Sequence, residues 1–255
     1  MLTLISPAKT LDFESELPAT GTSRCDFLPQ SETLIGQLKQ LRPSEIASLM
    51  NVSDAIAELN HDRFQDWERP SKRNGARPAL FAFQGDVYRG FKADELSIKQ
   101  LDYAQTHLRI LSGLYGMLRP MDLILPYRLE MGTKFATPGA KDLIAFWGDR
   151  LTNAVNAQLA SSHSKLILNL ASKEYFRSVD SRQLSAPVIT PAFKEVKNGK
   201  AKMITVFAKM ARGSMASWVM RKKARTLKKL YQFNDDGYRY DESLSSQWSP
   251  VFVRS

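Results

Sequence analysis

Residues 141–179 read KDLIAFWGDRLTNAVNAQLASSHSKLILNLASKEYFRSV, a stretch in which a helix pattern, a strand pattern and a second helix pattern follow one another. Apolar side chains along one face predict a helix over Lys141–Leu159. The run Leu166–Leu170 has the length and composition of a buried strand. A short helix is expected over Ser172–Val179, because a serine precedes it as a cap.

The same alternation continues toward the N-terminus. Leu2–Ile5 reads as a short buried strand. Asp94 or Ser97 is expected to cap a helix that runs through Leu111 and that Gly113 closes. Strand and loop should follow over residues 117–130, where prolines interrupt apolar residues.

Toward the C-terminus, Val188–Phe193 and Ala201–Phe207 read as two strands. The turn between them contains Asn198-Gly199, a strong hairpin signal. Helices and strands therefore interleave without a regular β-α-β rhythm, and no internal repeat appears. This favours a single α+β (mixed α/β) domain over residues 1–255, with a mixed sheet and surrounding helices, rather than a Rossmann fold or a barrel.

Charge is distributed unevenly along the chain. The 255 residues include 36 Lys plus Arg and 26 Asp plus Glu, a net charge of +10. Residues 1–150 are nearly neutral, whereas Lys165–Lys229 holds 16 basic and 3 acidic side chains. Such a segment suggests a polyanion partner, either nucleic acid or a membrane surface. A basic face that only keeps the protein in solution is the alternative.

The densest part of this segment predicts a basic helix from Ala208 or Ser214 to about Leu230. Like charges four residues apart, such as Arg221 and Arg225, repel each other on a helix, and a phosphate partner would relieve that repulsion. The apolar face is too modest for a membrane helix. The cations predicted here to contact DNA are Lys209, Arg212, Arg221, Lys222 and Lys223.

The segment LSGLYG at residues 111–116 suggests a second phosphate contact. A helix followed by a turn with two glycines is typical of a helix-hairpin-helix-like element, in which bare backbone N–H groups approach phosphate without reading bases. An ordinary glycine cap and turn is the alternative. The predicted DNA contacts are Arg109, Ser112, Gly113, Leu114, Tyr115, Gly116 and Arg119.

A third group of residues suggests catalysis. Carboxylates next to cations could form an acid–base site in one cleft, although surface ion pairs would explain the same residues. The candidates are Lys9, Arg128, Glu130, Lys173, Glu174 and Tyr175.

Several common functions are not indicated. The chain contains no dinucleotide fingerprint, no Walker A motif and no nucleophile elbow. Its three histidines are isolated and Cys25 is the single cysteine, so we expect no metal site, no cofactor and no disulfide. Without a signal peptide or an apolar run of about 20 residues, a cytoplasmic protein without a membrane partner is expected.

Motif blocks in a fixed order along essentially the whole chain carry a resemblance. They are SPAKTL at 6–11, FQGDVY at 83–88, LSGLYG at 111–116, LRP at 118–120, PYRLEM at 126–131, FWGD at 146–149, LASKEYF at 170–176 and AKMARG at 208–213. In this combination they resemble the YaaA peroxide-stress family. One difference is visible, since Met210 stands where the family block usually has a second lysine.

The resemblance implies a cytosolic protein that protects against hydrogen peroxide and is linked to lower free intracellular iron. It also implies binding to double-stranded or distorted DNA through a positively charged cleft and a helix-hairpin-helix element. The cleft would involve Lys9, Arg128, Lys173, Lys209 and Arg212. The alternative is an enzyme that acts on a phosphorylated or nucleotide-like small molecule in the same cleft.

Overall fold

The central sheet is organised around β1 (Leu2–Ile5) in the computed structural model, which describes residues 1–18, 21–197 and 200–255. β1 pairs in parallel with β5 (Leu108–Ser112) on one side and with β8 (Ile167–Asn169) on the other. β6 (Gly116–Leu118) adds to β5 in the antiparallel sense, and β9 (Val188–Ile189) adds to β8 in parallel. The order β6-β5-β1-β8-β9 is therefore a mixed sheet. Its inner strands are buried, as expected when helices and loops cover both faces.

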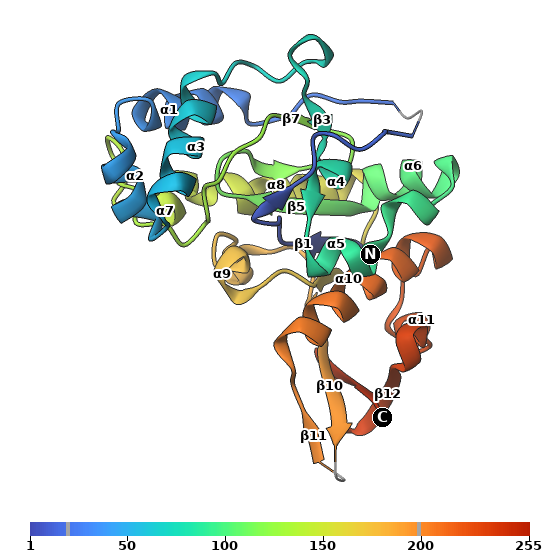
Figure 1. The fold of residues 1–255 in the computed structure, drawn as a ribbon. Coiled ribbons are helices and arrows are strands. Elements are labelled where there is room, and N and C mark those ends of the chain that lie inside the picture. Colours follow the sequence, from blue (N-terminus) through green and yellow to red (C-terminus); the bar gives the residue numbers. More distant parts are fainter. Residues whose placement is uncertain (19–20, 198–199) are drawn as a thin grey trace.

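A second sheet lies at the other end of the molecule (Figure 1), in the order β11-β10-β13-β12. β10 and β13 are parallel, and the two outer pairs are antiparallel. The bounds are β10 Ala192–Lys197, β11 Lys200–Lys202, β12 Arg239–Ser246 and β13 Ser249–Arg254. The predicted Asn198-Gly199 turn falls outside the described residues.

Two short antiparallel pairs complete the strands. β2 (Thr10–Leu11) pairs with β4 (Phe83–Gln84), and β3 (Arg77–Pro78) pairs with β7 (Leu123–Ile124). The first pair follows directly from the loop after β1. It therefore holds residues 10–11 and 83–84 next to the carboxyl end of the central sheet.

The helix α10 (Thr205–Lys222) lies between the two sheets (Figure 1) and contacts α5 (Asp86–Phe91), β1 and β10. Two glycines permit its close approach to α5. A Cβ atom on Gly213 would overlap the backbone of Val87, and a Cβ atom on Gly90 would overlap the backbone of Met210. Side chains at these crossing points would push the two helices apart.

Most of the remaining helices surround the central sheet, with α1, α2 and α3 packed together on one flank, whereas α11 lies beside the second sheet (Figure 1). Among the described residues, no helix combines the length and apolar character needed to cross a bilayer. The α-helices are α1 Leu28–Leu38, α2 Pro43–Met50, α3 Asp54–Gln65, α4 Ala79–Ala82, α6 Ile98–His107, α7 Leu143–Trp147, α8 Asp149–Ser161, α9 Lys173–Phe176 and α11 Leu227–Leu230. The 3-10 helices are Lys72–Asn74, Ala93–Glu95, Ser181–Gln183 and Asp235–Gly237.

The prediction of a mixed α+β fold is confirmed, but the expected helix through Leu111 is wrong at its C-terminal end. α6 ends at His107, and Leu108–Ser112 is the fully buried strand β5. Three of its five residues are apolar, and all five are buried, as in a strand covered on both faces. The spacing of the apolar residues in this segment fits a helix as well as a strand, and pairing with β1 decides in favour of the strand.

Backbone conformation changes two other expected elements. The helix predicted over 141–159 is divided at Gly148, which has φ +46° and ends α7. The basic helix is divided at Lys223, which has φ +48° and ends α10 before α11 begins. The strand expected over 201–207 is shorter, because β11 stops at Lys202 and α10 begins at Thr205.

Candidate functional site

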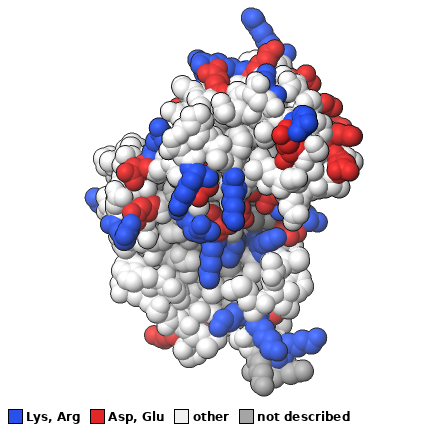
Figure 2. Space-filling view, turned by 90° about the vertical axis from the view of Figure 1, so that its left-hand side faces the viewer, with Lys and Arg blue, Asp and Glu red and all other residues white. Residues whose placement is uncertain are grey.

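A cleft of about 460 Å³ lies where the central sheet, α5, α9 and α10 meet. The carboxyl ends of the parallel strands β1 and β8 open into it, the place where open α/β sheets usually bind ligands. Its charged lining residues are Lys9, Asp86, Arg89, Glu130, Glu174, Lys209 and Arg212. In Figure 2, basic side chains gather over a hollow in the middle of one face, with acidic atoms inside it.

Hydrogen bonds tie the loops after β1 and β8 to each other. The backbone N–H of Ser172 donates to Ser6 Oγ at 2.8 Å, and the Tyr88 hydroxyl donates to the Ser6 carbonyl at 3.0 Å. Tyr88 is buried, and its hydrogen bond therefore anchors the loop after β1 to the core. Ser172 also caps α9 by accepting from the Tyr175 N–H. These contacts give the cleft a rigid floor.

One wall of the cleft carries paired charges. Glu130 accepts from Lys9 Nζ at 2.8 Å through one oxygen and from Arg128 at 3.1 Å through the other. Glu174 accepts from the Gly132 N–H at 3.0 Å. A Cβ atom on Gly132 would lie 2.9 Å from the same Glu174 oxygen, so a larger residue there would displace the carboxylate. Both carboxylates are held in defined positions.

The opposite wall carries cations without carboxylate partners. Lys209 and Arg212 are three residues apart on α10, and both line the cleft. Within the described part of the chain, neither forms an ion pair. Burial lowers the pKa of Arg212 from its ordinary value. A partly buried cation without a counter-ion favours an anionic ligand.

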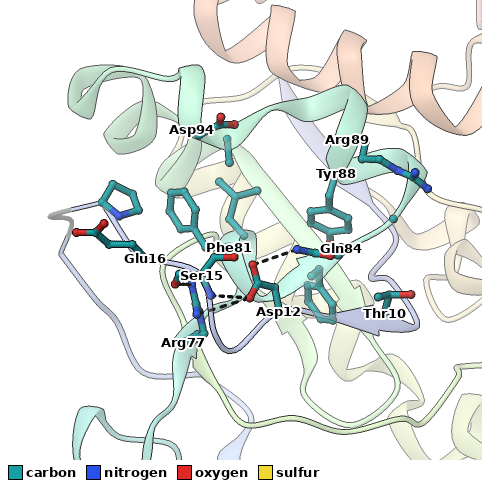
Figure 3. Close-up of a pocket in the computed structure, with 15 residues that line it drawn as sticks. Thr10, Asp12, Ser15, Glu16, Arg77, Phe81, Gln84, Tyr88, Arg89 and Asp94 are labelled. Atoms are coloured by element: carbon teal, nitrogen blue, oxygen red, sulfur yellow. Dashed lines mark hydrogen bonds and ion pairs between the residues drawn. The ribbon is translucent and has the colours of Figure 1, made fainter.

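A second pocket of about 630 Å³ adjoins the cleft (Figure 3). Its polar centre is Asp12, which accepts from the backbone N–H groups of Glu14 and Ser15 at 2.9 Å and from Gln84 Nε2 at 3.0 Å. The hydrogen bonds from Ser15, with that from Glu14, hold the pKa of Asp12 well below its usual range. The residues that line both spaces are Thr10, Gln84, Gly85, Tyr88 and Arg89.

The structure brings most of the predicted catalytic candidates together. Lys9, Glu130, Glu174 and Tyr175 all line the cleft. Burial raises the pKa of the Tyr175 hydroxyl above its usual range. Lys173 is exposed on α9 and is not among the lining residues.

The prediction of a helix-hairpin-helix-like element at residues 111–116 is wrong. These residues form the turn of the β5–β6 hairpin, and Ser112, Leu114 and Tyr115 are fully buried. Gly113 contacts the Leu129 backbone so closely that a Cβ atom would overlap it. The glycines serve packing inside the protein, because no phosphate can reach their N–H groups.

The two arginines beside this hairpin are also engaged internally. Arg109 is buried and donates to the carbonyl groups of Gln105 and Leu108, and burial lowers its pKa to about 10. Arg119 pairs with Asp122 and Asp26 at 3.0 Å. Both arginines stabilise the fold, and neither lines the cleft.

The basic residues at the end of α10 lie apart from the cleft. Arg221 pairs with Asp235, Lys223 lies over the Tyr103 ring, and Lys222 is exposed. With a rise of 1.5 Å per residue, Lys222 is about 20 Å along the helix from Lys209. The predicted DNA contacts at the end of α10 therefore do not lie at the cleft, whereas Lys209 and Arg212 line it together with the catalytic candidates.

Sequence reasoning missed Asp12, Arg77 and Gln84 as site residues. The one local signal was Gly85 in the block FQGDVY. The structure explains this glycine, because it has φ +139° and ψ −176°, a conformation that is essentially restricted to glycine. Gly85 directly precedes α5, so the backbone enters this helix through a conformation that other residues rarely adopt. Asp12 and Arg77 carried no comparable local signal.

Comparisons with known proteins agree with the motif blocks. Residues 1–244 match the family described as peroxide stress protein YaaA. A UPF0246 protein of Shewanella baltica (strain OS155) is 52% identical over 255 residues, which is all of both chains. A UPF0246 protein of Shewanella oneidensis is 51% identical over 254 residues, covering 100% of this chain and 99% of its own length.

Proposed function

Because the chain belongs to the YaaA peroxide stress protein family, we propose that it protects cytoplasmic DNA by binding the phosphate backbone along the cleft, without strong sequence preference. The observation that carries this proposal is the pair Lys209 and Arg212, which face the cleft without carboxylate partners in the described part of the chain. Phosphate contacts of this kind position nucleic acid but carry no sequence information. Exposed Lys222 lies at the far end of α10, apart from the cleft.

A salt titration of DNA binding tests this proposal. The double variant Lys209→Ala/Arg212→Ala should weaken binding to a duplex and lower the slope of log affinity against log salt by about 2, since each phosphate contact contributes about 0.9. Lys72→Ala/Arg73→Ala is the matched control, because it removes two exposed cations outside the cleft. Equal losses in both double variants would contradict a role for the cleft.

The family-implied lowering of free iron is a separate proposal. Among the described residues, no group of three or more His, Cys, Asp or Glu side chains is placed to hold a metal ion. We therefore propose that this effect depends on DNA or partner binding rather than on iron storage. Chelatable iron measured in peroxide-treated cells should rise with the Lys209→Ala/Arg212→Ala variant as much as with deletion of the protein.

A second candidate function is catalysis on a phosphorylated or nucleotide-like small molecule. The observation that favours it is the Lys9–Glu130 pair at 2.8 Å, which lines the same cleft as the cations Lys209 and Arg212. Turnover of nucleoside phosphates that Glu130→Gln abolishes, with DNA binding retained, would establish it. DNA binding without any turnover would leave the cleft as a binding surface.

A further inference from the structure

The pocket beside the cleft combines a polar edge with an aromatic wall. Figure 3 shows Asp12, Arg77 and Gln84 gathered on one side, with Phe81 beside them. We propose that this pocket takes one unpaired nucleobase, while the phosphate of the same nucleotide lies in the cleft near Arg89 and Arg212. This inference rests on the proposed function and names the nucleic-acid feature that the site recognises.

The polar edge offers hydrogen-bond acceptors in fixed positions. Asp12 is held ionised by the N–H groups that it accepts, and Gln84 donates its amide N–H to Asp12. This orientation leaves the Gln84 amide oxygen as an acceptor, since no donor reaches it within the described residues. Amino and imino groups of bases are the matching donors.

A buried donor lies next to these acceptors. The Arg77 side chain is 7% exposed and donates through Nη2 to the Ser15 carbonyl at 2.6 Å. Its Nη1 lies 3.8 Å from Asp12 Oδ1, so the guanidinium balances the charge of that carboxylate and holds it in place. The edge that a base meets is therefore formed by Asp12 and the Gln84 amide, and the amino and imino groups of a base are its complement.

The aromatic wall provides a surface on which a base can stack. Phe81 is half-buried and lines the pocket, whose volume of about 630 Å³ lies in the range of small-molecule sites. Unpaired bases stack on such side chains, whereas a base inside a duplex has its faces and its pairing edge covered. The pocket is therefore suited to a bulged or extruded nucleotide.

The two spaces are continuous, which allows a base and its phosphate to occupy both. Gln84 and Arg89 line both the pocket and the cleft. Arg89 is 72% exposed and pairs with Asp86 at 2.8 Å. An exposed pair of this kind is weak, so a phosphate can replace the carboxylate.

The test compares three DNA duplexes at one salt concentration: fully paired, with a single bulged adenosine, and with an abasic residue at the bulge. The protein should bind the adenosine bulge about tenfold more tightly than the abasic bulge, the gain expected from stacking one base. Gln84→Met keeps the size of the side chain and should abolish that preference. Gln40→Met is the matched control, because Gln40 is an exposed glutamine that lines neither space.

The outcomes separate the two proposals. Lys209→Ala/Arg212→Ala should weaken all three duplexes together and keep the preference for the base. Equal affinity for the adenosine and abasic bulges would overturn the base pocket and leave backbone binding in place. If no duplex binds, the proposed function is wrong, and titration with adenosine monophosphate then tests the base pocket by itself. Binding of the nucleotide that is lost in Gln84→Met supports the pocket, and the absence of binding overturns it.

Discussion

At the scale of single residues, the glycines of this chain show why local motifs mislead. Gly116 has φ +70°, and a Cβ atom there would lie 2.7 Å from the Trp147 ring. The Trp147 indole N–H donates to the Gly113 carbonyl at 3.0 Å. The two glycines that suggested a phosphate contact are therefore needed for the packing of a buried tryptophan against a hairpin.

Gly116→Ala should destabilise the protein by roughly 1–3 kcal/mol, because alanine is strained at this φ and overlaps Trp147. Denaturant unfolding followed by tryptophan fluorescence measures the change. Gly36→Ala is the control, since nothing lies within 4 Å of a Cβ atom there and Gly36 is inside α1. The control should stabilise the protein by about 0.5–1 kcal/mol. Similar effects of the two substitutions would contradict this account of Gly116.

His107 should make stability depend on pH. It is buried against Tyr103, and burial, with the positive charges of the N-terminal amine, Arg225 and Arg109, lowers its pKa below the ordinary value. The unfolded chain binds the proton more tightly than the folded protein, so His107 costs no stability above about pH 6.5 and destabilises as pH falls below it. His107→Gln should lose less stability than the unsubstituted protein between pH 7 and pH 5, as urea unfolding at each pH would show. An unchanged pH dependence would contradict the prediction.

At the scale of elements, the contact between α5 and α10 positions the cationic wall of the cleft. Gly90 and Gly213 let the two helices touch through their backbones. Lys209 and Arg212 precede Gly213 by one turn or less, so the crossing point fixes where their side chains lie. The glycine of the AKMARG block therefore contributes to the site without contacting a ligand.

Gly213→Ala should separate the helices and destabilise the protein by roughly 1–3 kcal/mol, the usual range for overpacking. It should also weaken DNA binding, because Lys209 and Arg212 move with α10. Thermal unfolding and duplex binding, measured on the same samples at a temperature where the variant is folded, check both effects. Unchanged DNA affinity in a destabilised variant would show that the crossing does not position the cations.

Met210→Lys adds a cation to α10 between Lys209 and Arg212. The Met210 side chain is 38% exposed, so the lysine can reach solvent without disturbing the core. If DNA runs along α10, the variant should raise the slope of log affinity against log salt by about 1. An unchanged slope would place position 210 outside the DNA contact.

At the scale of the whole molecule, the basic segment 165–229 is spread over several elements rather than one face. Part of it lies in β10 and β11, and part lies in α10 and α11 (Figure 1), where, in the part of the chain that the structure describes, only Lys209 and Arg212 line the cleft. Among the described residues, two cations of this segment are already paired with acids, Arg182 with Asp180 and Arg221 with Asp235. Net charge therefore overstates the number of cations available to a polyanion.

The spacing of the available cations predicts a dependence on duplex length. Lys222 is about 20 Å from Lys209 along α10, the length of about six base pairs. Lys222→Ala/Arg225→Ala should weaken binding to a 20-base-pair duplex but leave binding to a duplex shorter than six base pairs almost unchanged. Lys209→Ala/Arg212→Ala should weaken both. Equal effects of the two double variants on the short duplex would contradict this arrangement.

The class of fold, the strands β1 and β8 and the family were predictable from short segments, because apolar runs and ordered motif blocks are local properties. The sequence also suggested a shared cleft for Lys9, Glu130 and Glu174, with surface ion pairs as the alternative, and all three residues line the cleft. Only the tertiary structure decided that Leu108–Ser112 is a strand, since the neighbouring strand β1 supplies its hydrogen bonds. Only the tertiary structure placed Asp12, Arg77 and Gln84 together, because residues far apart in the chain meet through pairing between β2 and β4 and through packing that no local pattern records.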